Sequence, residues 1–186
     1  MLPPGLSDTP VILKGVRFNV HAVELPRHSG GTQRREVVSP PDSVVVLPLL
    51  EPAPGDADER VVLIRNERFA VGRTLWELCA GTMEAGEDPA TCGARELIEE
   101  TGYRAETLEP IADFFPTPGF CTEHMHGFVA RGLTHVGQDL DETEKIEVHT
   151  LPLPEAVAMI GRGEVQDGKT IALLLHYHVF RQKGRR

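Results

Sequence analysis

The segment that most restricts the possible fold is the uninterrupted apolar run Ser43–Leu50, with the sequence SVVVLPLL. A strand with one solvent face alternates apolar and polar residues, whereas a strand buried on both faces is apolar throughout. A second apolar run, residues 60–65 (RVVLIR), follows after a segment rich in Pro, Gly and Asp. We therefore predict two neighbouring core strands in a sheet that is covered on both sides.

Weaker patterns elsewhere predict the rest of a mixed fold. Further strands are expected near residues 75–80, 111–115, 124–130 and 146–151, and two helices near residues 154–161 and 169–180. With a third helix at residues 89–101, this irregular order indicates an α/β fold in which a mixed sheet lies between helices.

The helix at residues 89–101 has the clearest start and stop signals. Asp88 is suited to the N-cap, Pro89 to the first helical position, and Gly102 to the left-handed position after the last turn. One face of this helix is apolar and the remaining arc is charged. The apolar face contains Ala90, Ala94, Leu97 and Ile98, and the charged arc contains Arg95, Glu96, Glu99 and Glu100.

Residues 1–40 are predicted to form a small β appendage, and residues 41–186 the main domain. Two short β-rich runs, residues 11–13 and 18–25, precede a polar segment at residues 27–33. So few strands are not stable alone. A length of 186 residues suits one well-buried core with such an appendage.

Composition excludes several classes of function. The chain has 19 basic and 28 acidic residues, a net charge of −9, which disfavours nucleic-acid partners and means that an anionic substrate would need a metal bridge. No window approaches about 18 uncharged apolar residues, and the N-terminus lacks the pattern of a secretion signal. The three cysteines form no CxxC pair. We therefore expect a cytoplasmic protein without a membrane partner.

The acidity is concentrated around the helix at residues 89–101. Glu96 and Glu100 stack one turn apart on one helix face, with Glu99 at its edge. Converging carboxylates make a hard-oxygen site for Mg²⁺ or Mn²⁺, which Arg95 and Glu87 would help to orient. A bare Glu-x-x-Glu-Glu is more often a solvated helix face. The six acids within seventeen positions are Glu84, Glu87, Asp88, Glu96, Glu99 and Glu100.

The complete pattern has seven fixed identities, besides the apolar positions Leu97 and Tyr103, and these identities favour the metal site over the solvated face. It is Gly81-x5-Glu87-x7-Arg95-Glu96-Leu97-x-Glu99-Glu100-x-Gly102-Tyr103, and it resembles the signature box of the Nudix hydrolase family. The resemblance implies an α/β/α sandwich, a divalent metal ion, and hydrolysis of a diphosphate linked to another group.

From about residue 34 to residue 178 the chain is similar to the ADP-ribose pyrophosphatase branch of that family. RNERFA followed by WELCAG, at residues 65–81, resembles the branch's "RQYR…WELPAG" stretch, although Asn66, Glu67 and Cys79 depart from it. Residues 115–123 resemble its "SPG…E" loop, residues 141–144 its catalytic loop, and residues 165–170 the start of its last helix.

This resemblance implies a role for individual residues. Glu96, Glu100, Glu144 and the backbone carbonyl of Ala80 would hold the metal, with Glu99 a further possible ligand; Glu142 would be the general base; Arg68, Arg35, Glu77 and Glu123 would line the substrate site. Arg35 belongs to residues 34–38, which resemble a strand that reaches the partner's site in this branch. The resemblance therefore also implies a homodimer, and residues 1–40 suit exchange between subunits.

We thus predict metal-dependent hydrolysis of ADP-ribose to AMP and ribose 5-phosphate. One alternative is another nucleoside diphosphate sugar, such as GDP-mannose or ADP-glucose, because the box does not contact the sugar or base. Another is a regulator that binds ADP-ribose without turnover, which a damaged box would favour. His124 and His126 share a strand face and could form a metal pair, although such histidines are more often simply hydrogen-bonded.

Overall fold

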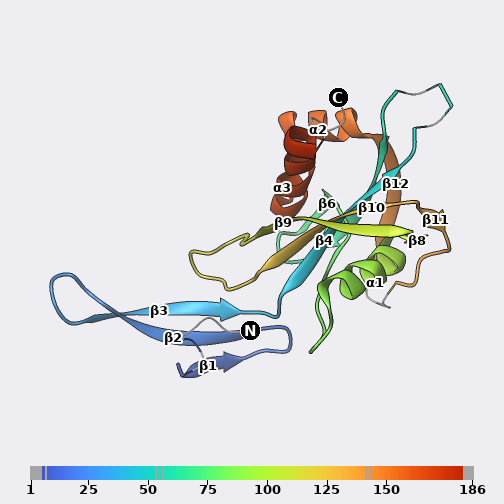
Figure 1. Ribbon diagram of the computed structural model, residues 1–186. Helices are drawn as coiled ribbons and strands as arrows, with labels where there is room; N and C mark the ends of the chain where they lie inside the picture. Colours follow the sequence, from blue (N-terminus) through green and yellow to red (C-terminus); the bar gives the residue numbers. More distant parts are fainter. Residues whose placement is uncertain are drawn as a thin grey trace.

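The computed structural model describes residues 6, 8–52, 54–55, 57–140, 142 and 144–181. Figure 1 shows a main body of sheet and helices from which a second sheet, near the N-terminus, projects. The elements in chain order are β1 (Val11–Lys14), β2 (Asn19–Pro26), β3 (Thr32–Ser39), β4 (Ser43–Leu50), β5 (Arg60–Arg68), β6 (Arg73–Glu77), β7 (Ala80–Thr82), α1 (Pro89–Thr101), β8 (Tyr103–Arg104), β9 (Thr107–Phe114), β10 (Met125–Arg131), β11 (Thr134–His135), β12 (Ile146–Pro152), α2 (Leu153–Gly161), α3 (Gly168–His176) and the π-helical turn η1 (Tyr177–Arg181).

The main sheet is mixed and is centred on β4. Its strand order is β12-β5-β4-β10-β9, with β6 paired to β5 and β7 paired to β4. Strands β4 and β10 are parallel, and the other pairs in this sheet are antiparallel. The first half of β4 pairs with β7 and its end pairs with β5, so β4 brings the segment that precedes α1 into the sheet.

Both faces of β4 are buried, as its continuous apolar sequence predicts. Val45, Leu47 and Leu49 belong to a core cluster with residues of α2 and α3. Val44 and Val46 point to the opposite face, where they pack in a second cluster with residues of α1. In Figure 1, α1 accordingly lies on one side of the sheet and α2 and α3 on the other. Because the side chains of a strand alternate between faces, two covering layers require apolar residues at every position.

Two differences from the predicted elements concern residues 75–80 and the last helix. The strand expected at residues 75–80 is divided into β6 and β7, because the N–H of Leu78 donates to Thr170 Oγ1 of α3 at 2.8 Å instead of continuing a ladder. The last helix ends its α-helical part at His176 and continues as η1. Tyr177, at this change, is buried, and its hydroxyl donates to Glu59 at 2.9 Å.

The N-terminal strands β1, β2 and β3 form a separate antiparallel sheet. Its backbone contact with the main body runs through Val38, which donates to the carbonyl of Phe120 at 2.8 Å and accepts from the N–H of Thr122 at 3.0 Å. Strand β1 leaves Val11, Ile12 and Leu13 about half exposed. In the described part of the chain, no helix has the length and apolar character needed to cross a membrane.

Candidate functional site

Helix α1 begins and ends at the predicted residues. The side chain of Asp88 accepts from the N–H groups of Ala90 and Thr91, each at 3.1 Å, and caps the first turn. Gly102 has a left-handed φ of 74°, and its N–H donates to the carbonyl of Ile98 at 2.8 Å. These caps fix the helical register and therefore the face on which its carboxylates lie.

The charged face of α1 forms one wall of an acidic pocket of about 620 Å³. Residues from other segments complete this pocket: the β1–β2 turn, the β3–β4 connection, the end of β5, strand β7 with the loop that follows it, and the segment after β11. Its carboxylates come from Glu84, Glu96, Glu99, Glu100, Asp139 and Glu144, and its other lining residues are Val16, Arg17, Pro41, Arg68, Ala80, Gly81, Thr82, Arg95 and Leu140.

Glu100 is the most deeply buried of these acids, with 4% of its surface exposed. Its Oε2 accepts from the N–H of Ala80 at 2.9 Å, which ties α1 to β7. Burial, together with the nearby Glu96 and Glu144, raises the pKa of Glu100 to about 8, although the Ala80 N–H and Arg68 oppose the shift. A buried carboxylate beside two others is an arrangement that a bound cation would stabilise.

Glu96 approaches the backbone of β7 at Gly81, where a Cβ would force its carboxylate to shift. A Cβ on Gly81 would lie 1.8 Å from the carboxylate carbon of Glu96 and 1.9 Å from its Oε1. Burial raises the pKa of Glu96, while its contact with Arg95 lowers it. The glycine that opens the sequence pattern thus provides the space for the carboxylate.

Arg95 links three carboxylates. Its Nη1 donates to Glu96 at 2.7 Å and to Glu99 at 2.9 Å, and its Nε donates to Glu87 at 3.1 Å. The contact with Arg95, together with the N–H of Glu84, lowers the pKa of Glu87 to about 2. Arg95 and Glu87 therefore hold Glu96 and Glu99 in one hydrogen-bonded network on this face.

A second pocket of about 470 Å³ adjoins the acidic one, and Arg68, Ala80, Gly81 and Thr82 line both. Glu77, which is fully buried in its wall, accepts from Arg68 Nε at 2.8 Å and Nη2 at 2.6 Å. Lys169 Nζ donates to the same carboxylate at 2.5 Å and lies 3.0 Å from Asp167. Glu77 therefore holds the Arg68 guanidinium at the junction of the two pockets.

Most of the residues expected at the site come together, but two do not. Ala80, Glu96, Glu99, Glu100 and Glu144 line the acidic pocket, and Arg68, Glu77 and Glu123 line the adjoining one.

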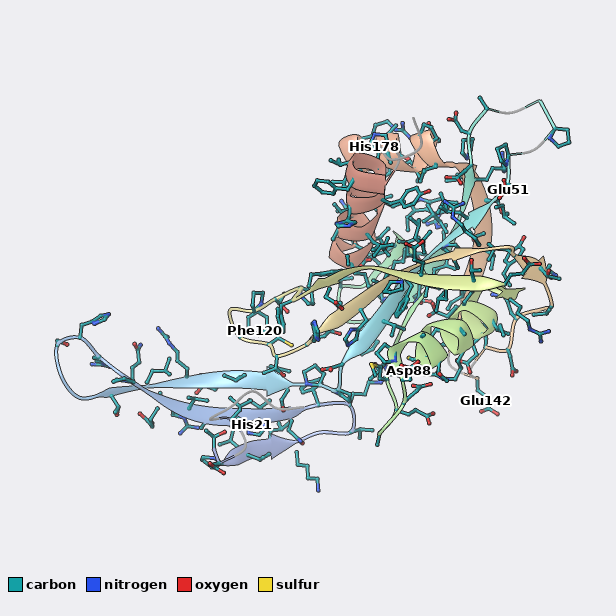
Figure 2. All side chains as sticks on the ribbon, in the orientation of Figure 1. His21, Glu51, Asp88, Phe120, Glu142 and His178 are labelled. Carbon is teal, nitrogen blue, oxygen red and sulfur yellow. The ribbon has the colours of Figure 1, made fainter. Side chains whose placement is uncertain are left out.

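Glu142 and Arg35 are absent from the described lining of both pockets. Glu142 is exposed, and Figure 2 shows it at the surface below α1. Arg35 lies in β3 opposite Val23, on the projecting sheet.

The structure also adds residues that the sequence analysis did not single out. Lys169 forms an ion pair with Glu77. The N-cap pattern from Asp167 to Thr170 is the sequence feature that could have placed Lys169 in the first turn of α3. Val16 and Arg17, from the turn between β1 and β2, line the acidic pocket. No local pattern relates these two residues to α1, because only the path of the folded chain brings them there.

The donor set of the acidic pocket fits a hard divalent cation. Carboxylate oxygens, with a backbone carbonyl at Ala80, are ligands that Mg²⁺ and Mn²⁺ accept. The space left at Gly81 for the Glu96 carboxylate and the burial of Glu100 both agree with such an ion.

Comparisons with known proteins identify a family and several relatives. Residues 40–174 match the family model described as NUDIX domain. The chain is 36% identical over 159 residues to an ADP-ribose pyrophosphatase of Bacillus subtilis (strain 168), covering 84% of this chain and 82% of that protein. It is 35% identical over 158 residues to a methanol dehydrogenase activator of Bacillus methanolicus, covering 84% and 81%.

A GDP-mannose pyrophosphatase of Citrobacter koseri is 34% identical over 185 residues, covering 93% of this chain and 91% of that protein. A solved structure described as an ADP compounds hydrolase superposes with a TM-score of 0.81 at 19% identity, covering 96% of this chain and 94% of that one. This match confirms the α/β fold predicted from the sequence.

Proposed function

The chain belongs to the Nudix family, and from this premise we propose that it hydrolyses ADP-ribose to AMP and ribose 5-phosphate with Mg²⁺ or Mn²⁺. In this reaction an oxygen of water attacks phosphorus, the bond from that phosphorus to the bridging oxygen breaks, and the released phosphate takes up a proton. The family membership and the ADP-ribose pyrophosphatase relative support this substrate class.

The observation that carries the proposal is the junction between the two pockets. An acidic pocket suited to a cation meets a second pocket at Arg68, where a guanidinium is held in place by Glu77. A diphosphate bound across the junction would have metal on one side and Arg68 on the other. A fixed guanidinium matches the geometry of phosphate oxygens.

The ligands of the metal would be the carboxylates of Glu96, Glu100 and Glu144 and the carbonyl of Ala80, with Glu99 as a further ligand. When bound, a divalent ion polarises phosphate oxygens and lowers the pKa of coordinated water.

The other residues bind substrate and move the proton. Arg68 uses Nε and Nη2 for Glu77, and we assign Nη1 to a phosphate oxygen. Glu123 Oε1 accepts from Ser43 at 3.0 Å, which orients its carboxylate in the wall of the second pocket. Glu142, as the general base, accepts the proton of the attacking water.

The substrate is tested with a panel of ADP-ribose, ADP-glucose and GDP-mannose, with product identification. We expect AMP and ribose 5-phosphate, with kcat/KM highest for ADP-ribose and activity abolished by EDTA. A higher value for GDP-mannose would favour the first alternative, which the Citrobacter koseri relative supports. Tight ADP-ribose binding without turnover would favour the regulator, although the box is intact.

Two variants test the assignments within the site. Glu100→Gln should abolish turnover, because it removes a metal ligand while keeping the acceptor for the Ala80 N–H. Glu142→Gln should lower kcat much more than it changes substrate affinity. An unchanged kcat for Glu142→Gln would assign the base to another residue.

We further propose that the protein acts as a cytoplasmic homodimer on a small-molecule substrate, without nucleic acid or membrane. In this dimer, Arg35 on the projecting sheet contacts the substrate bound by the partner. The position of Arg35 away from the pockets of its own chain is compatible with such a role.

A further inference from the structure

A second group of metal-ligating side chains lies outside the acidic pocket. Asp42, His124 and His126 each offer one ligand atom, and these three atoms all lie within 4.8 Å of one another. The three residues are partly buried, with 20–32% of each side chain exposed. None of them is among the described residues that line the acidic pocket.

The sheet places these residues together. His126 lies opposite Val44 of β4 and opposite Asp113 of β9, and the N–H of Ser43 donates to the carbonyl of His124 at 2.9 Å. Because side chains alternate along strands, Asp42, His124 and His126 share one face at the start of β4 and β10.

His126 is oriented as a metal ligand is. Its Nδ1 lies 2.9 Å from Asp113 Oδ1, and its Nε2 lies 3.9 Å from Asp42 Oδ2. A neutral His126 that donates from Nδ1 to Asp113 has a lone pair on Nε2. This lone pair then faces a second acceptor, the carboxylate of Asp42. A carboxylate that fixes the tautomer of a ligating histidine in this way is common at metal sites.

The ring of His124 is also held in place. It stacks on Phe115, with ring centroids 4.9 Å apart, and its centroid lies 4.4 Å from that of His126. Two imidazoles and one carboxylate suit zinc and neighbouring transition metals better than Mg²⁺. Side-chain shifts on the order of 1 Å would bring the three atoms to tetrahedral spacing.

We propose that Asp42, His124 and His126 bind one Zn²⁺ ion, with water as the fourth ligand and Asp113 orienting His126. Asp42 lies between β3 and β4, and its carbonyl accepts from the N–H of Met83 at 2.9 Å. An ion bound there would link strand β10 to the β3–β4 connection, which leads to the projecting sheet. This site is independent of the proposed hydrolysis.

The test is Zn²⁺ binding by equilibrium dialysis of the full chain in excess Mg²⁺, which competes for the acidic pocket. Wild type and Glu100→Gln should each retain one Zn²⁺ per chain. His126→Gln and Asp42→Asn should lose it, and Asp113→Asn should weaken it by roughly 10- to 100-fold. His28→Gln, in the exposed turn between β2 and β3, is the matched histidine control and should bind as wild type does.

Thermal melts provide a second measurement that separates binding from folding. Zn²⁺ should raise the Tm of wild type and Glu100→Gln but not of Asp42→Asn, whose Tm without zinc should match wild type. The proposal is overturned if wild type retains no Zn²⁺ in this dialysis. It is equally overturned if Glu100→Gln loses the ion while His126→Gln keeps it.

Discussion

Glu100 is buried, and its burial disfavours the charged form of the carboxyl group. Its pKa is raised from an ordinary 4.5 to about 8, so between these values the folded protein holds a proton that the unfolded chain has released. The free energy of unfolding contributed by Glu100 therefore falls as the pH rises through this window. A bound cation would remove this penalty.

We predict that Glu100→Gln stabilises the metal-free protein, and more so at pH 8 than at pH 5. The neutral amide keeps the acceptor for Ala80 without a buried charge. Thermal melts in EDTA across this range measure the difference in Tm between variant and wild type. Glu24→Gln, on the projecting sheet, is the control, and a difference that does not change with pH would contradict the raised pKa of Glu100.

Gly81 is the second informative residue, because it makes room for Glu96. Gly81→Ala should displace the Glu96 carboxylate, since its Cβ would overlap that group. We expect the Mg²⁺ concentration for half-maximal activity to rise roughly 10- to 100-fold, measured by metal titration of the initial rate. Gly161→Ala, in α2, meets no atom within 4 Å and should behave as wild type; equal Mg²⁺ dependence of the two variants would argue against Glu96 as a ligand.

At the scale of elements, α1 is stabilised by its caps and provides the acidic face. Asp88→Ala removes the acceptor for two N–H groups and should lower the free energy of unfolding by about 1 kcal/mol. For a chain of this size that corresponds to about 2–4 °C in Tm. Well below the Tm, kcat should be unchanged.

Calorimetry of Asp88→Ala measures this loss, with Asp88→Ser as the control that restores a cap. The alanine and serine variants should differ in stability and agree in kcat. A large drop in kcat for both would mean that Asp88 acts in the site and not only in the helix.

At the scale of the whole molecule, the projecting sheet is an unusual surface. Edge strand β1 leaves Val11, Ile12 and Leu13 46–53% exposed, and its register against β2 shifts between Val11 and Leu13. An unpaired sheet edge is a template for pairing with another chain, and exposed apolar patches mark interaction sites. We therefore expect this sheet to form the interface of the proposed homodimer.

Light scattering after size exclusion tests this interface. The full chain should have twice the monomer mass, and Leu13→Glu should reduce it to a monomer. Leu175→Glu, a partly exposed leucine on α3, is the matched control and should remain a dimer. A monomeric wild-type chain would remove both the interface and the role of Arg35 across it.

Local sequence was sufficient to predict the framework of this protein. The apolar run of β4 identified a strand buried on both faces, and the Asp88 and Gly102 caps located α1. The spacing of Glu96 and Glu100 placed both carboxylates on one helix face. These predictions succeeded because alternation in strands, helical periodicity and capping depend on residues a few positions apart.

Contacts between distant segments were decided by the tertiary structure alone. Arg68 of β5 contacts Glu77 of β6, although these two residues are not opposite each other in the register, and Lys169 reaches Glu77 from α3. Asp42 and His126 are neighbours only because β4 and β10 are parallel partners. No local pattern encodes such proximity, since it depends on how the whole sheet packs between its helices.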